Sequence, residues 1–160
     1  MSMTGGRRLR ALVLRVAGTN CDIETASAFE KAGGEAERFH VNRLTENRSL
    51  LDSFHILALP GGFSYGDDIA SAKAWATEMR CALGDEIRRF VEKGKLVLGI
   101  CNGFQALVKS GLLGADSQGR PQVTLGANDS GRYEDRWVHL KASTDKCVFV
   151  RPGEDAFLPV

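Results

Sequence analysis

One segment of the sequence joins an aliphatic run, a cysteine and the start of a helical pattern. Residues 96–100 read Leu-Val-Leu-Gly-Ile, which is typical of a buried parallel strand, and the pattern becomes helical from Phe104 onward. Cys101 therefore lies at the turn between strand and helix, flanked by Gly99 and Gly103. Small neighbours let a nucleophile stand in a strained turn clear of the sheet, and the positive end of a helix dipole favours a thiolate. The segment predicts a catalytic cysteine.

A cysteine that attacks an acyl carbon needs two backbone donors for the oxyanion that forms, and each donor is worth about 3 kcal/mol. The amide of Asn102, which follows the nucleophile, is placed for one of them. The second must come from a neighbouring strand-end loop where the backbone can approach closely. Gly61 and Gly62 follow a predicted strand, and they suit this role because glycine adopts unusual dihedral angles without side-chain bulk.

The elements that must position these residues alternate between strand and helix as far as Gly111, which indicates a parallel sheet covered on both faces. Past Gly111, short strands without helices between them predict an antiparallel extension at one edge. The apolar stripes of two of the helices are expected to be Ile23, Ala26 and Phe29, and Ile87, Phe90 and Val91. Strands are expected at residues 9–16, 37–41, 55–59, 95–100, 122–125, 136–140 and 147–150, and helices at residues 22–31, 83–92 and 104–110.

Three loops leave the carboxyl ends of the predicted parallel strands, at residues 17–22, at residues 60–68 and at the Cys101 turn. All three are rich in Gly, Asn, Asp, Ser or Thr. Ligands of an open parallel sheet gather at the carboxyl ends of its strands. We therefore expect these loops to meet at one edge and to form the site.

Length and composition predict one compact domain. The 160 residues are 43% hydrophobic, enough for one core, with residues 1–8 as a disordered lead-in and residues 9–160 as the domain. Lysine and arginine number 21 against 20 acidic residues, and this net charge of +1 argues against nucleic acid or an anionic membrane as a partner. No apolar run approaches the roughly 18 residues of a membrane span. Residues 1–8 lack the hydrophobic core of a secretory signal, so none is expected.

The four cysteines show no spacing typical of a metal site. Cys21, Cys81, Cys101 and Cys147 lack both a C-x-x-C pair and histidines at ligand spacing. A zinc site or a disulfide framework is therefore not expected, and a reducing cytoplasm is the predicted location.

Four motifs, in order and spacing, resemble the glutaminase subunits of phosphoribosylformylglycinamidine synthase, which are class I glutamine amidotransferases of purine biosynthesis. The resemblance runs from about Leu9 to the last residue. The motifs are Gly-Thr-Asn-Cys-Asp at 18–22, Leu-Pro-Gly-Gly-Phe-Ser-Tyr-Gly-Asp at 59–67, Gly-Ile-Cys-Asn-Gly-Phe-Gln at 99–105 and Arg-Trp-Val-His-Leu-Lys at 136–141.

The resemblance implies a role for each matching residue. Cys101 would attack the side-chain amide of glutamine, form a glutamyl thioester and release ammonia. Gly62 and Asn102 would supply the oxyanion-hole amides, and Gln105 would contact the bound glutamine. The implied fold is a flavodoxin-like three-layer α/β sandwich with a mostly parallel central sheet and antiparallel edge strands.

The resemblance also implies partners. A large synthetase subunit would bind ATP with magnesium and formylglycinamide ribonucleotide and would consume the ammonia, and a third small subunit completes the complex in many bacteria. No cofactor is expected in this chain. The Gly-rich loop at Gly61 lacks the Gly-Lys-Ser/Thr ending of a phosphate loop.

The sequence departs from the family at its general base. Relatives carry a histidine and a glutamate two residues apart, on a segment just after the position of Val160, and no His-x-Glu occurs in these 160 residues. His40 and His55 read as surface or core residues, and His139 matches a family histidine that is not the base. We expect a C-terminally truncated glutaminase that turns over poorly by itself.

Two other functions remain open at this point. A cysteine hydrolase of the related elbow superfamily would need its own glutamate and histidine, and the residue after its nucleophile is usually a histidine where this chain has Asn102. A non-catalytic scaffold subunit could dock on the synthetase and keep the elbow by descent. Cys21 reads as a reactive thiol or an incidental one. Asp67 and Asp68 read as residues that contact the partner or gate the site, or as residues that solvate a mobile loop.

Overall fold

The computed structural model describes residues 8–116, 118–143 and 145–159. The expected lead-in therefore lies, except for Arg8, outside the described residues. The chain divides into two compact units, residues 1–125 and 126–160, which are treated separately below. The single domain expected over residues 9–160 stays a prediction. None of the described helices is long and apolar enough to cross a membrane.

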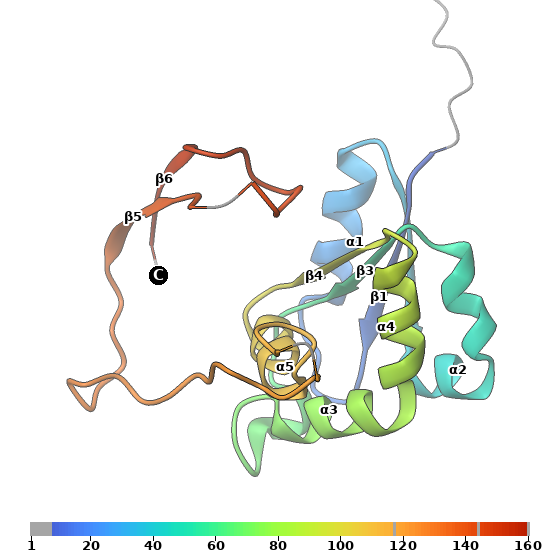
Figure 1. Ribbon diagram of the computed structural model, residues 1–160, viewed down its shortest axis with the longest axis horizontal. Coiled ribbons are helices and arrows are strands. Elements are labelled where there is room, and N and C mark those ends of the chain that lie inside the picture. The colour runs from blue at the N-terminus through green and yellow to red at the C-terminus, as the bar shows by residue number, and fades with distance from the viewer. Residues whose placement is uncertain (1–7, 117, 144, 160) are drawn as a thin grey trace, which may run out of the picture. The chain divides into compact units, whose positions relative to one another are not determined.

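Unit 1 is built on a four-stranded parallel sheet in the order β2-β1-β3-β4 (Figure 1). Leu57 of β3 lies opposite Leu12 of β1 on one side and Val97 of β4 on the other. All four carboxyl ends consequently point to one edge, as the alternation of strands and helices predicted. The strands are β1 (Arg10–Arg15), β2 (Glu35–His40), β3 (Ile56–Leu59) and β4 (Leu96–Gly99).

Helices cover both faces of the sheet, because alternate strand residues point to opposite sides. Leu12 and Leu57 pack with residues of α3, α4 and α5 in the larger core cluster. Val13 and Ala58 pack with Ala26 of α1 in the smaller one. This confirms the layered α/β fold. The helical elements are α1 (Asp22–Lys31), α2 (Val41–Glu46), η1 (Arg48–Ser53), η2 (Ser64–Asp67), α3 (Lys73–Glu78), η3 (Met79–Leu83), α4 (Gly84–Glu92) and α5 (Asn102–Ser110).

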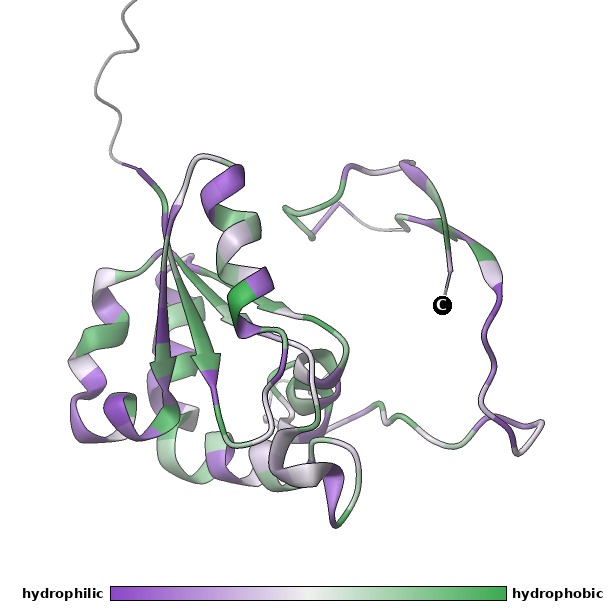
Figure 2. Cartoon of the chain, turned by 180° about the vertical axis from the view of Figure 1, so that it is seen from behind, coloured by the Kyte–Doolittle hydropathy of each residue, from purple (hydrophilic) through white to green (hydrophobic). Residues whose placement is uncertain are grey.

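Two of the predicted apolar stripes each include one residue that the structure exposes. Ile23 is 61% exposed and Val91 is 51% exposed, so both expectations were wrong. Ala26 and Phe29 on α1 pack in the smaller core cluster, and Ile87 and Phe90 on α4 are buried. Figure 2 shows hydrophobic strands in the middle of the sheet and helices along which hydrophobic and hydrophilic residues alternate. In each helix, two of the three residues predicted to face the core do so, and the third faces solvent.

Unit 2 holds an antiparallel two-stranded sheet of β5 (Trp137–Lys141) and β6 (Asp155–Pro159). The strand predicted at residues 136–140 corresponds to β5, which begins and ends one residue later. Residues 122–125 and 147–150 form no strand, and the partner of β5 lies further along the chain. The ring of Phe157 instead packs against Trp137, with 5.0 Å between centroids, and against His139, with 4.6 Å. These cross-strand ring contacts lie between β5 and β6, and β6 is a strand that was not predicted.

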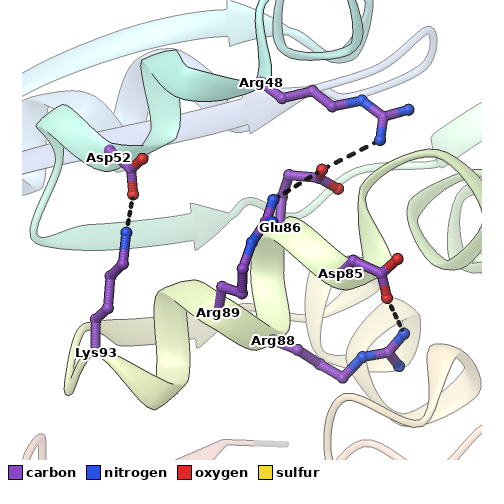
Figure 3. A network of polar contacts seen from close by, with 7 residues as sticks. All are labelled: Arg48, Asp52, Asp85, Glu86, Arg88, Arg89 and Lys93. Carbon is purple, nitrogen blue, oxygen red and sulfur yellow. Dashed lines mark hydrogen bonds and ion pairs between the residues drawn. The ribbon is translucent and has the colours of Figure 1, made fainter.

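Ion pairs tie α4 to the segment that precedes β3 (Figure 3). The carboxylate of Glu86, which is 9% exposed, accepts from Arg48 of η1 and from Arg89 of its own helix, both at 3.1 Å. Lys93 at the end of α4 donates to Asp52 of η1 at 2.7 Å. The helix is thereby fixed at both ends relative to the segment that leads into β3, the strand before Gly61.

Candidate active site

Cys101 occupies the turn between β4 and α5, as predicted. Its backbone angles are φ 51° and ψ −111°, and a positive φ at a non-glycine residue persists only where the surroundings enforce it. The residue is the N-cap of α5, and its side chain is exposed. The thiol therefore stands at the helix start, at the edge where the strands end.

Two glycines explain how α5 can begin so close to the sheet. A Cβ added to Gly103 would stand 2.0 Å from the carbonyl oxygen of Leu59 in β3. A Cβ added to Gly99 would stand 2.6 Å from Cδ1 of Leu107. Neither position has room for a side chain. The glycines that flank the cysteine are thus required by the packing of α5 on β3 and β4.

The loop after β3 brings Gly61 and Gly62 beside the nucleophile. A Cβ on Gly61 would lie 3.4 Å from the Cβ of Cys101. Gly62 has φ +136°, and a Cβ there would lie 2.5 Å from the backbone nitrogen of Asn20, so only glycine fits. Within the described residues, the N–H groups of Gly62 and Asn102 donate to no protein acceptor. Two unpaired amides therefore lie on the two segments next to Cys101, and their role as an oxyanion hole stays a prediction.

Residues 17–21 form the third segment at this edge. The carbonyl oxygen of Gly61 accepts from the backbone nitrogens of Asn20, at 3.3 Å, and Cys21, at 3.2 Å. The Sγ of Cys21 lies 3.7 Å from the Cβ position built on Gly61, so the exposed thiols of Cys21 and Cys101 flank the same glycine. The expected meeting of the three loops is confirmed.

The side chain of Asn102 connects two of these segments. It is 2% exposed, and its Oδ1 accepts from the backbone nitrogen of Ser64 at 3.1 Å. Its Nδ2 donates to Oδ1 of Asp67 at 3.0 Å and to Oε1 of Gln105 at 3.2 Å. Gln105 is half-buried with its amide oxygen engaged by Asn102, and its contact with glutamine stays a prediction.

The sequence did not show what the acidic part of this loop does. Asp67 accepts from the backbone nitrogen of Ala72 at 2.8 Å as well as from Asn102, whereas Asp68 is exposed. Nearby, the hydroxyl of Tyr65 donates to the carboxylate of Glu78 at 2.5 Å. Burial raises the pKa of Tyr65, and the hydrogen bond to Glu78 raises it further. The Gly-Asp-Asp sequence at residues 66–68 was the feature that could have indicated this role. It did not show which of the two aspartates accepts the hydrogen bonds.

A hollow of about 550 Å³ in unit 1 lies between α3, α5 and residues 121–124. Lys73, Arg80 and Lys109 line it, but neither Cys101 nor the loop glycines do. It is therefore not the site of the predicted chemistry. Within the described part of the chain, no three His, Cys, Asp or Glu residues are grouped as metal ligands.

Several known proteins are similar to this chain in sequence. The model of the CobB/CobQ-like glutamine amidotransferase domain matches residues 8–160. Subunit PurQ of phosphoribosylformylglycinamidine synthase from Dehalococcoides mccartyi is 48% identical over 154 residues, which cover 96% of this chain and 60% of that protein. Human phosphoribosylformylglycinamidine synthase is 37% identical over 171 residues, which cover 98% of this chain and 13% of that protein.

A solved structure is similar as well. A chain in the structure of PurLQS from Thermotoga maritima superposes with a TM-score of 0.75 at 32% identity, over 96% of this chain and 66% of that one. The chain thus spans about 60% of the length of the curated subunits that it matches.

Proposed function

We infer the function from one premise: this chain belongs to the family of CobB/CobQ-like glutamine amidotransferase domains, and the subunits it resembles are named PurQ. This confirms the resemblance seen in the motifs around Gly62 and Cys101. We propose that the chain is the glutaminase part of a phosphoribosylformylglycinamidine synthase. In this role it hydrolyses glutamine to glutamate and ammonia, and the ammonia goes to formylglycinamide ribonucleotide on a large synthetase subunit.

The proposed reaction begins at the Sγ of Cys101. The thiolate attacks the amide carbon of glutamine, and the N–H groups of Gly62 and Asn102 bind the oxygen that becomes negative. The amide nitrogen takes up a proton and leaves as ammonia when the C–N bond breaks, and a glutamyl thioester remains on Cys101. Water then attacks the thioester, which releases glutamate and restores the thiol. The observation that carries the proposal is the pair of unpaired amides beside a strained cysteine.

Both steps of this reaction need a proton acceptor and donor. His55 lies at the start of β3, away from the carboxyl-end edge, and its Nδ1 accepts from the backbone nitrogen of Arg10 at 3.0 Å. His40 ends β2, and two strands separate β2 from β4 in the sheet. His139 matches a family histidine that is not the base. We propose that none of the three serves Cys101, and that turnover depends on a His-x-Glu pair absent from these 160 residues.

The synthetase partner, its ATP and magnesium, and the third small subunit remain part of the proposal. They rest on the solved structure of PurLQS from Thermotoga maritima, which contains the similar chain, and on the family resemblance.

A chloroketone analogue of glutamine tests the pocket directly. We expect it to alkylate Cys101 faster than Cys21, Cys81 or Cys147, with excess glutamine protecting the thiol and Cys101→Ser abolishing the label. Peptide mass spectrometry reads all four cysteines in one sample. Equal labelling of the four thiols, or labelling that glutamine does not slow, would contradict a glutaminase pocket and would favour the scaffold function.

A second assay tests the missing base. Glutamate release is measured for the 160-residue chain and for a chain extended at its C-terminus by a His-x-Glu segment of the kind that the family resemblance implies, each mixed with a synthetase subunit. We expect the extended chain to be faster by orders of magnitude. Equal rates would show that a group within these residues already acts as the base.

A further inference from the structure

The residue that offers one amide to the proposed oxyanion hole also holds the loop that offers the other. The backbone N–H of Asn102 is unpaired, whereas its buried side chain bonds to Ser64 and to Asp67 of the loop. Within the part of the chain that the structure describes, these two bonds are the hydrogen bonds that join residues 60–72 directly to α5. They add to the backbone bond from Ile100 to Leu59, at 3.0 Å, which joins the ends of β4 and β3 beside Cys101 and Gly61.

Asp67 extends this connection to the next helix. A single carboxylate oxygen of Asp67 accepts from Asn102 at 3.0 Å and from the backbone nitrogen of Ala72, the N-cap of α3, at 2.8 Å. Asp67 and Ala72 both have left-handed backbones, with φ of 53° and 56°, and so does Tyr65. Strained non-glycine residues of this kind persist only when surrounding contacts over-determine them. The two bonds to Asp67 are such contacts.

The first half of the loop is held by a different set of bonds. The backbone nitrogen of Phe63 donates to the carbonyl of Gly18 at 2.9 Å, and that of Tyr65 donates to Ala17 at 2.8 Å. These bonds fix the loop to the segment after β1 and not to the helix that begins at the nucleophile. The bonds of Asn102 add the connection between this loop and the helix that begins at the nucleophile.

We propose that Asp67 and the Asn102 side chain are positioning residues, which hold the loop of residues 61–72 so that the Gly62 amide is aimed at the oxyanion formed on Cys101. The inference rests on the proposed glutaminase function. It assigns Asp67 an anchoring role, where the sequence also allowed a solvated residue. Asp68, its exposed neighbour, has no such role.

The test compares variants that differ only in this hydrogen bonding. Asp67→Ala removes both acceptor bonds. Asp67→Asn keeps an amide oxygen that can accept from both donors, so it should restore most of the function. Asp68→Ala is the matched control, because it removes a neighbouring carboxylate that is exposed. Urea unfolding of each variant establishes that the fold is retained.

Two alkylating reagents separate oxyanion binding from exposure of the thiol. The glutamine chloroketone places a ketone oxygen where the amide oxygen would lie, whereas iodoacetamide requires only an accessible thiolate. Loss of one oxyanion donor lowers rates by about 10²- to 10³-fold, so partial misplacement in Asp67→Ala should slow chloroketone labelling of Cys101 by about tenfold or more. Its iodoacetamide rate should stay within about twofold of the parent chain.

Other results would contradict either the positioning role or the glutaminase function. Equal slowing with both reagents, an unchanged chloroketone rate in Asp67→Ala, or an Asp67→Asn rate as low as that of Asp67→Ala would overturn the inference while leaving the glutaminase proposal intact. Absence of selective Cys101 labelling in the parent chain would instead refute the glutaminase function, and the inference with it.

Discussion

At the scale of single residues, the site depends on positions where no side chain fits. Gly62 lies against the backbone of Asn20, and Gly103 lies against the carbonyl of Leu59. A clash with backbone cannot be relieved by a rotamer change, so a larger residue must move a whole segment. The positive φ of Cys101 is enforced in the same way, by a helix held close to the sheet on one side of the turn.

Replacement of Gly103 should therefore destabilise the protein. In Gly103→Ala the new methyl group would meet the carbonyl oxygen of Leu59 at 2.0 Å, so α5 must shift away from β3. We expect a loss of about 1–3 kcal/mol in the free energy of unfolding, measured by urea denaturation. Gly84→Ala in α4 is the matched control, because its methyl group would meet nothing nearer than 3.5 Å. Equal stability of the two variants would contradict the close packing of α5.

The phenol of Tyr65 should lose its proton at a higher pH than an ordinary tyrosine does. Burial, followed by the hydrogen bond to Glu78, raises the pKa of its phenol above the usual value of about 10. The fold thus favours the neutral phenol, so this contribution to stability is complete below the ordinary pKa and is lost as the pH rises above it. In a Tyr133→Phe background, which leaves Tyr65 as the remaining tyrosine, phenolate absorbance should develop above the ordinary range.

A further substitution shows whether burial or the hydrogen bond to Glu78 raises the pKa of Tyr65 more. Because burial is the larger cause, Glu78→Gln should bring the Tyr65 titration only part of the way back. A full return to the value of the urea-unfolded chain would show that Glu78, and not burial, dominates.

At the scale of elements, the sequence was sufficient where the apolar pattern was strong. β1, β3, β4 and α5 are read directly from aliphatic runs and glycine stops. The helix α3 was not foreseen, because its N-cap is Ala72 in a left-handed conformation with no capping hydrogen bond from its side chain. The Cys101 elbow and the Asn102 amide followed from local spacing, whereas the choice of Gly62 over Gly61 came from the family resemblance.

The contacts of Asn102 and Asp67 could not be predicted in the same way, because they join residues 35 positions apart. Local propensity and periodicity carry no information about such a pairing. The predicted topology showed that the loops meet at one edge of the sheet, but not which of their side chains bond to each other. The strand β6 was missed for a related reason, since its register with β5 is set by cross-strand ring contacts.

The ion pairs of Glu86 should stabilise the protein by holding α4 against η1. Glu86→Gln removes two charge-assisted bonds from a nearly buried carboxylate, while Arg48 and Arg89 remain more than half exposed and can be solvated. We expect a loss of about 1 kcal/mol in the free energy of unfolding. Asp85→Asn, which removes the exposed pair with Arg88, should have a smaller effect. A larger effect at Asp85 would contradict the importance of burial.

At the scale of the whole molecule, the two units differ in how they are stabilised. Every buried residue among those described lies between Ala11 and Ser110, within unit 1. Unit 2 consists of a two-stranded sheet whose residues are exposed or half-buried. Two-stranded sheets are marginally stable at best in water. The proposed site residues, from Gly62 to Gln105, all belong to the unit that contains the core.

Unit 1 should consequently fold without unit 2. A chain that ends at Leu125 keeps both core clusters, so its urea midpoint and the steepness of its transition should match those of the 160-residue chain. Residues 126–160 alone should show no cooperative transition. Chloroketone labelling of Cys101 in the shorter chain extends the test from folding to the site: an unchanged rate would place every group that governs thiol reactivity in unit 1. A lower midpoint, or loss of labelling in a chain that still folds, would show that unit 2 contributes to the core or to the site.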